Sequence, residues 1–205
     1  LIAGFFQPTE GRITIDGNPV RKPGPDRGVV FQAPTLYPWM NVRQNVELGL
    51  KFQRKSKETR ATSSDHFLDM VGLTDFAERR PYELSGGMQQ RCQIARVLAS
   101  DPEIVLMDEP FAALDALTRE RLQEELLTIW RETGKTILFI THSVEEAVFL
   151  GSRVLVMSRR PGRIVLDEDS TFGRGDSRIP VTELRSTPEF VALSDRVRSA
   201  IQGSM

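Results

Sequence analysis

Short apolar runs separated by amphipathic stretches are the main pattern along this chain. The runs IVLM and TILFI, at residues 104–107 and 136–140, are almost entirely hydrophobic, and a shorter run, GVVF, occupies residues 28–31. Strands that are hydrophobic throughout are typical of parallel sheets with both faces buried. Because helical patterns lie between these runs, we predict an α/β fold whose parallel sheet is covered by helices on both faces.

Capping residues mark where several of the intervening helices begin and end. Asp115 precedes an amphipathic stretch that Gly134 closes, and the pair Ser143 and Glu146 has the spacing of a capping box. A last helix opens at Thr187–Pro188, since proline is favoured in a first helical turn. The residues predicted to form apolar faces are Leu122, Leu126, Ile129 and Trp130 in the first of these helices, and Phe190, Leu193, Val197 and Ile201 in the last.

Three further patterns complete the predicted elements. GRITIDG, at residues 11–17, alternates like a strand and ends in an Asp-Gly turn. RVLVM and GRIVLD, at residues 153–157 and 162–167, are predicted to pair as a hairpin, and residues 167–180 are predicted to form a polar surface loop. The polar, helical pattern that begins at residue 33 predicts a helical insertion between the first two sheet strands.

Composition narrows the class of protein. A formal net charge of -1 and a pI near 6.2 argue against a dedicated nucleic-acid surface. The single cysteine, Cys92, excludes an internal disulfide and is predicted to be a buried structural thiol within a helix. No apolar run approaches the about 20 residues that a helix needs to span a bilayer, so we predict that the chain has no transmembrane helix.

The segment ELSGGMQQR, residues 83–91, places two glycines at the start of a predicted helix. Each glycine costs about 1 kcal/mol relative to alanine within a helix, so Gly86 and Gly87 indicate that bare backbone N–H groups are needed there. Such groups and the positive end of the helix dipole form a site for an anion, for which phosphate is the usual candidate. The GKT at residues 134–136 is no phosphate loop, because it runs from helix to strand; we interpret it as a helix stop.

Polar side chains follow three of the predicted strands at the point where each strand ends. Gln32 follows the first strand, Asp108 and Glu109 follow the second, and His142 follows the third. Ligands of open α/β sheets bind beyond the carboxyl ends of the strands, so we expect these side chains to share one edge. Adjacent strand residues point in opposite directions, and we therefore assign Asp108 to Mg²⁺ and Glu109 to the general base of phosphoryl transfer to water.

Each of these residues also has a purely structural interpretation. Acids at strand ends can cap a sheet, and a histidine such as His142 at a strand–helix junction is commonly a hydrogen-bonded turn residue. Gln32 alone carries little information. The apolar strand before the two acids, the proline after them and the nearby Asp115 favour the chemical interpretation. Trp39, in LYPWM, is either a core residue or an exposed anchor for a partner.

Four motifs, taken in order, resemble those of the ATP-binding subunits of ABC transporters. The signature, Walker B motif, D-loop and H-loop of that family are matched by LSGGMQQR, IVLMDEP, ALD and FITH, and Gln32 fits its Q-loop. One local departure is Met88, where the family more commonly has glutamine. The resemblance spans nearly the whole chain. It implies an α/β fold with the parallel-sheet core of a P-loop NTPase, of the ABC ATPase type, and a helical subdomain insertion.

The resemblance also implies ATP as a ligand and a second copy of the chain. In the family, the signature helix of one subunit closes over the γ-phosphate of ATP held by the other subunit of a head-to-tail dimer. Ser85, Gly86 and Gly87 would make this contact, and Gln89 would support it. Asp115, in the D-loop, is assigned to the same nucleotide site.

The remaining assignments concern hydrolysis within one subunit. The resemblance implies catalytic roles for Glu109 and His142, and it places Gln32 in contact with both the nucleotide and Mg²⁺. Asp108 is the other Mg²⁺ ligand. ATP and Mg²⁺ are therefore the expected cofactors.

The family pattern also predicts how the chain is divided. Leu1–Gly4 resembles the last turn of a helix, and in the family the phosphate loop precedes this segment, so we expect the natural chain to continue upstream. The 205 residues alone are then expected to bind and hydrolyse ATP very weakly. We predict a single ABC ATPase domain with an α/β core at 1–32 and 101–166, a helical subdomain at about 33–100, and a C-terminal loop and helix at 167–205.

Longer stretches such as YPWMNVRQNVELGL and VMSRRPGRIV are most similar to subunits that power nitrate, sulfonate, taurine or bicarbonate importers. That likeness implies integral-membrane permease subunits as partners, indirectly a solute-binding protein, and no nucleic acid. The expected location is peripheral, on the cytoplasmic face of the plasma membrane. Two alternatives are a catalytically inactive, truncated ABC ATPase and a non-transport ABC ATPase, although the sequence shows no coiled-coil insertion or basic linker typical of the latter.

Overall fold

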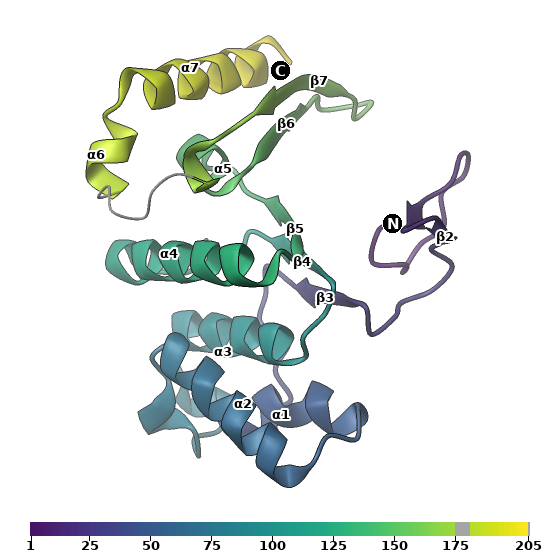
Figure 1. Ribbon diagram of the computed structural model, residues 1–205, viewed down its shortest axis with the longest axis vertical. Helices are drawn as coiled ribbons and strands as arrows, with labels where there is room; N and C mark the ends of the chain where they lie inside the picture. The colour runs from purple at the N-terminus through teal and green to yellow at the C-terminus, as the bar shows by residue number, and fades with distance from the viewer. Residues whose placement is uncertain (175–180, 205) are drawn as a thin grey trace.

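The computed structural model describes residues 1–174 and 181–204. α1 (Val42–Phe52) and α2 (Lys57–Met70) lie at one end of the molecule, and α7 (Pro188–Gly203) lies at the other (Figure 1). A small parallel sheet occupies the middle, between these two ends.

The parallel sheet has three strands in the spatial order β3, β4, β5. Val30, Met107 and Phe139 lie side by side across it, so the carboxyl ends of the strands meet at one edge. The apolar runs of the sequence form these strands, and the predicted parallel pairing is confirmed. The strand bounds are β3 (Arg27–Val30), β4 (Ile104–Asp108) and β5 (Thr136–Ile140).

Helices connect the strands and pack against one face of the sheet. α3 and α4 lie on the same side (Figure 1), and on that side Val30, Val105 and Met107 are fully buried. Between β3 and β4 lie α1, α2, the 3₁₀ turns η1 (Thr74–Phe76) and η2 (Pro81–Glu83), and α3 (Gly86–Ala99); between β4 and β5 lies α4 (Ala116–Thr133).

The opposite face of the sheet is open within the described residues, so the prediction of helices on both faces is wrong for this part of the chain. Leu138 and Ile140 of β5 are exposed there, Ile140 by 50%. The handedness of the connections explains this. Right-handed crossovers that advance across a sheet in one direction place their helices on one face, and the order β3, β4, β5 advances in this way.

A two-stranded hairpin precedes the sheet. β1 (Thr14–Ile15) and β2 (Asn18–Pro19) pair antiparallel around the predicted Asp-Gly turn. Both turn residues have positive φ, 47° at Asp16 and 79° at Gly17, as a two-residue hairpin turn matching the strand twist requires.

The C-terminal part forms a second layer around its own core. The predicted hairpin is confirmed, but β7 extends to Asp169 and a 3₁₀ turn follows, which corrects the prediction of a polar loop from residue 167 onwards; residues 175–180 of that loop lie outside the described residues. β7 extends further because β6 still pairs with it at residues 167–169, beyond the apolar part of the β7 sequence. The elements are α5 (Val144–Leu150), β6 (Arg153–Met157), β7 (Ile164–Asp169), η3 (Phe172–Arg174), α6 (Val181–Arg185) and α7.

Most of the predicted helix ends are confirmed. Asp115 accepts a hydrogen bond from the Thr118 N–H at the start of α4, and Gly134 ends that helix with φ at 62°. The capping box predicted at Ser143 is only half formed. Ser143 caps α5, but the Glu146 carboxylate is buried and accepts hydrogen bonds from the Gln123 amide and the Thr141 hydroxyl instead. A buried carboxylate needs such donors, and this need outweighs the local capping bond.

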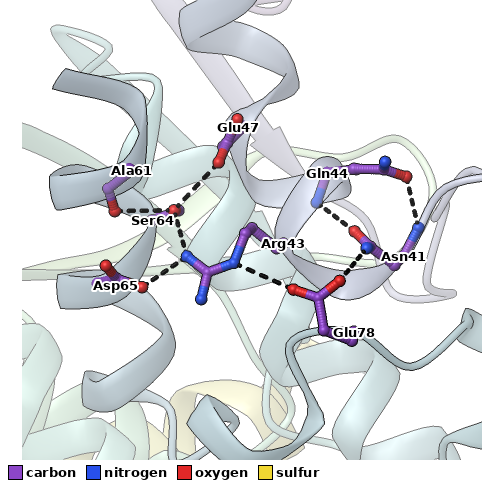
Figure 2. Close-up of polar contacts among 8 residues, drawn as sticks. All are labelled: Asn41, Arg43, Gln44, Glu47, Ala61, Ser64, Asp65 and Glu78. Carbon is purple, nitrogen blue, oxygen red and sulfur yellow. Dashed lines mark hydrogen bonds and ion pairs between the residues drawn. The ribbon is translucent and has the colours of Figure 1, made fainter. Parts of the chain in front are cut away.

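Polar contacts join α1 to α2. Arg43 of α1 donates to the Ser64 hydroxyl of α2 at 3.2 Å and pairs with Asp65 and, at 3.4 Å, with Glu78 (Figure 2). Cys92 of α3 is fully buried nearby, and burial raises the pKa of its thiol to about 12, which confirms a structural thiol.

Candidate functional site

Three of the predicted strand-end residues meet in one cluster. Gln32 Nε2 donates to Glu109 Oε2 at 3.1 Å, and His142 Nε2 lies 2.6 Å from Glu109 Oε1. The Glu109 side chain is only 18% exposed, whereas that of His142 is 87% exposed. The three side chains come from the ends of β3, β4 and β5, so the parallel sheet brings their backbones to one edge.

The backbone turns sharply at Glu109. Its φ is 46°, in the left-handed region, and its N–H donates to the Ile140 carbonyl at 2.9 Å. A residue other than glycine in this region costs about 1–3 kcal/mol and persists only where the surrounding structure holds it. The turn ends the strand ladder and directs the Glu109 side chain toward Gln32 and His142.

Asp108 is placed differently from its neighbour. It is the last residue of β4 and is exposed, and its carboxylate makes no hydrogen bond or ion pair with any residue that the structure describes. Within the same residues, no group of three or more His, Cys, Asp or Glu side chains is arranged to hold a metal ion. Mg²⁺ commonly takes one or two protein ligands and completes its shell with water and phosphate oxygens, so an unpaired carboxylate at this edge of the sheet fits that ion.

α3 begins with a serine cap and two glycines. Ser85 caps the helix, because its Oγ accepts a hydrogen bond from the Met88 N–H at 3.3 Å. Gly86 and Gly87 form the first turn, where helical N–H groups have no partner within the helix. A Cβ at Gly86 would meet no atom within 4 Å, so the chain's own packing does not require glycine there.

The residues around this helix start hold it in place. A Cβ added to Gly87 would lie 3.4 Å from the Ala113 carbonyl oxygen, so the segment ending in Asp115 adjoins the helix. Asp115 is an N-cap, and the donor N–H of Thr118 lowers the pKa of its carboxyl. Gln89 donates its amide to the carbonyls of Pro81 and Leu84, which supports the turn before α3.

The two groups of predicted site residues remain separate within one chain. No hydrogen bond or ion pair of the described residues joins the Gln32, Glu109 and His142 cluster to the start of α3 at Ser85, Gly86 and Gly87.

Two buried glutamines were missed by the sequence interpretation. Gln90 and Gln93 of α3 are almost fully buried and donate their amides to the Phe31 carbonyl, next to Gln32. The available signal was a pair of glutamines three residues apart on the otherwise apolar face of a helix.

The structure decides between the two interpretations of Trp39. Its side chain is 66% exposed, so it is not a core residue. The ring of Tyr37 lies 5.3 Å away, and the Arg80 guanidinium donates to the Trp39 carbonyl, so the loop is held while the indole projects outward.

A cavity of about 670 Å³ lies elsewhere, between the β6–β7 turn and the end of α7. Arg159, Arg160 and Arg163 line it, and none of the strand-end residues does. It is therefore separate from the cluster around Glu109. Within the described residues, no helix combines the length and the apolar character needed to cross a bilayer.

Comparison with known sequences points to one family. A family model described as ABC transporter matches residues 1–112. The chain is 51% identical to the taurine import ATP-binding protein TauB of Rhizobium johnstonii, across 99% of this chain and 78% of that protein. It is 50% identical to the nitrate import ATP-binding protein NrtD of Synechocystis sp., across 99% of this chain and 77% of that protein.

Solved structures show the same likeness. The chain is similar to the dimeric ATP-binding cassette MJ0796 in a post-hydrolysis state bound to ADP and Pi, with a TM-score of 0.73 and 35% identity over 82% of this chain and 77% of that one. A second dimeric structure of MJ0796, a bacterial ABC transporter cassette, gives a TM-score of 0.69 and 36% identity over 75% of this chain and 71% of that one.

Proposed function

Because the chain belongs to the family of ABC transporter ATP-binding subunits, we propose that it hydrolyses ATP to drive the import of a small anionic or zwitterionic solute such as taurine, another sulfonate or nitrate. The observation that carries the chemistry is the Glu109 carboxylate held between Gln32 and His142. The solute class is supported by the taurine and nitrate importers to which the chain is about equally similar.

Glu109 acts as the general base in this proposal. A carboxylate offers about four lone-pair sites, of which Gln32 and His142 each occupy one. The remaining sites are available to a water molecule. Glu109 accepts a proton from that water as its oxygen attacks the γ-phosphorus and the bond to the β-phosphate oxygen breaks.

Gln32 and His142 prepare the base for this step. His142, in the tautomer with its proton on Nε2, donates to one carboxylate oxygen while Gln32 donates to the other. These two donors hold the Glu109 carboxylate in one orientation. Asp108, with the Gln32 amide oxygen, would hold Mg²⁺, which when bound neutralises charge on the phosphates.

The start of α3 serves the other half of the site. Ser85, Gly86 and Gly87 would donate N–H groups to the γ-phosphate of ATP on a second copy of the chain, in a head-to-tail dimer. Gln89 supports this contact through its hydrogen bond to the turn before the helix. Asp115 supports it by capping α4, at the end of the segment that adjoins the start of α3. The dimeric cassettes to which the chain is similar support this arrangement.

The exposure of Trp39 supports a partner surface at this loop. We place integral-membrane permease subunits against the loop at residues 34–48, which would hold the protein peripherally at the cytoplasmic face of the membrane. A solute-binding protein would act through the permease. The names of the relatives as import subunits support these partners.

The test is solute uptake by proteoliposomes that contain the full-length protein, its permease and its solute-binding protein. ATP-dependent uptake of taurine or of nitrate is expected, and it should be lost in Glu109→Gln. Uptake that continues unchanged in Glu109→Gln would contradict the assignment of the base. Uptake of neither taurine nor nitrate, with ATP hydrolysis intact, would contradict the solute class alone.

A further inference from the structure

One face of α3 holds the segment that follows β3. Gln90 Nε2 and Gln93 Nε2 both donate to the Phe31 carbonyl, at 3.1 and 2.7 Å. Gln93 Oε1 accepts from the Thr35 N–H at 2.9 Å and from the Thr35 hydroxyl at 2.8 Å. Every polar atom of the fully buried Gln93 amide is therefore used, and three of its four contacts reach this segment or the peptide before Gln32.

Arg96 extends the same face by one turn. Its guanidinium donates to the Thr35 carbonyl at 2.8 Å and to the Thr35 hydroxyl at 2.9 Å, and it lies 5.8 Å from the centre of the Tyr37 ring. Three side chains spaced three residues apart on α3 thus hold residues 31–37. Gln90 and Gln93 are almost fully buried, so loss of a partner leaves an amide group unsatisfied, whereas Arg96 is only partly buried.

The hydrogen bonds from Gln90 and Gln93 act directly on the peptide unit between Phe31 and Gln32. The Phe31 carbonyl belongs to the peptide unit that contains the Gln32 N–H, so Gln90 and Gln93 set the plane from which the Gln32 side chain extends. That side chain reaches Glu109 Oε2 at 3.1 Å. A displacement of α3 by a fraction of this distance is enough to change whether the Gln32–Glu109 hydrogen bond forms.

α3 is one uninterrupted helix from Gly86 to Ala99, so its first turn and Gln93 move together. Resting on the proposed function, in which the first turn meets ATP on the partner copy, we propose that Gln93 is the positioning residue through which α3 holds Gln32 against the base. Gln90 and Arg96 support Gln93 in this role. ATP bound by the partner fixes the place of α3, and α3 then fixes Gln32 against the base of its own site.

The experiment measures ATP hydrolysis by the full-length dimer as a function of ATP concentration. Wild type is expected to show a Hill coefficient above 1. Gln93→Met keeps the length of the side chain but removes both amide atoms, and it should bring the Hill coefficient to about 1. Thr35→Val, which removes only the hydroxyl shared by Gln93 and Arg96, should move it in the same direction and leaves α3 untouched.

Arg43→Met is the matched control. Arg43 also joins elements of the helical region through polar contacts (Figure 2), and none of its hydrogen bonds or ion pairs with the described residues reaches residues 31–37. It should lower the melting temperature while the Hill coefficient stays at the wild-type value. A purely structural role for Gln93 would make Gln93→Met behave in the same way as Arg43→Met.

A double-mutant cycle tests the route through Gln32. In a Gln32→Ala background, Gln93→Met should cause no further change in the Hill coefficient. The inference is overturned if Gln93→Met and Thr35→Val keep wild-type cooperativity, or if wild type itself has a Hill coefficient of 1. Wild-type protein that hydrolyses no ATP would instead overturn the proposed function, and the inference with it.

Discussion

At the scale of single residues, the neighbours Asp108 and Glu109 differ in backbone conformation, because the chain turns sharply at Glu109. Asp108 ends the strand, with its carboxylate exposed and without a partner among the described residues, while Glu109 adopts a left-handed backbone and is held between Gln32 and His142. The same chemical group therefore has two environments one residue apart. An unpaired carboxylate suits a cation, and an oriented one suits a proton transfer.

Substitution of the two acids should have opposite effects on the dimer. Glu109→Gln keeps the shape but removes the base, so hydrolysis should fall by about 10² to 10⁴ while Mg-ATP still binds and holds a closed dimer. Asp108→Asn should weaken Mg-dependent nucleotide binding and leave the protein monomeric. Sizing chromatography of both full-length variants in Mg-ATP checks this, and the reverse pattern would mean that the two roles are exchanged.

At the scale of elements, α3 combines two structural features in one helix. Its first turn is open at Gly86, and its buried face carries Gln90, Gln93 and Arg96 to the segment after β3. Its apolar residues would have formed a stable helix without any of these. The two glycines lower its intrinsic helix propensity, and the two buried glutamines cost desolvation that only their hydrogen bonds offset.

Gly86→Ala should separate stability from activity. The new Cβ meets no atom of the chain, so the melting temperature should stay within a degree or two or rise slightly, since alanine is favoured in helices by up to about 1 kcal/mol. The methyl group would occupy the space that a phosphate needs, and ATP hydrolysis should fall by about 10-fold or more, equivalent to about 1.4 kcal/mol.

Gly203→Ala is the matched control for this change. Gly203 is also a helical glycine whose Cβ would meet nothing, but it lies in α7, away from the proposed site. Its hydrolysis rate should equal that of wild type. A Gly86→Ala protein that hydrolyses ATP as fast as Gly203→Ala would argue that no ligand approaches the first turn of α3.

The start of α4 should show a pH dependence set by Asp115. The Thr118 N–H lowers the pKa of this carboxyl below its usual 3.8, so ionised Asp115 contributes stability above the unfolded pKa and loses it as the pH falls through the folded one. Asp115→Asn keeps an N-cap without the charge. The difference in unfolding free energy from wild type should be constant from about pH 5 to 7 and shrink below about pH 4. Urea denaturation across this range measures it, and a gap that widens in acid would exclude this role of the charge.

At the scale of the whole molecule, two cores share one helix. α4 contributes Leu122 and Leu126 to the core beneath the parallel sheet, and Leu127 to the core beneath β6, β7 and α7. The exposed Trp39 lies outside both, in a loop braced by Arg80. A large aromatic side chain that is held in place but left in solvent is typical of a partner surface.

Trp39→Ala should weaken co-purification of the full-length protein with its permease. Loss of a central aromatic anchor typically costs about 2 kcal/mol or more, roughly 30-fold in Kd, while basal ATP hydrolysis should change little. Phe52→Ala, at the end of α1 and 77% exposed, provides the control. Equal co-purification of both variants with the permease would contradict the assignment of Trp39 to the partner surface.

Much of the candidate site could be predicted because it depends on local patterns. An apolar run that ends in a polar residue specifies both a buried strand and the edge where its side chain emerges, so Gln32, Glu109 and His142 were placed at one edge from the sequence alone. Helix caps such as Asp115 and Gly134 depend on residues three or four apart, which the sequence contains directly.

The sequence by itself determined the strands, the helix ends and the polar residues at the sheet edge, because each follows from contacts between near neighbours in the chain. Only the tertiary structure decided that helices cover one face of the described sheet, that Trp39 is exposed, and that Gln93 holds the peptide of Gln32. These depend on the path of the connections and on contacts between residues about 60 positions apart, such as that of Gln93 with Phe31. Hydrophobic patterns specify which residues are buried but not which distant backbone groups their polar neighbours will meet.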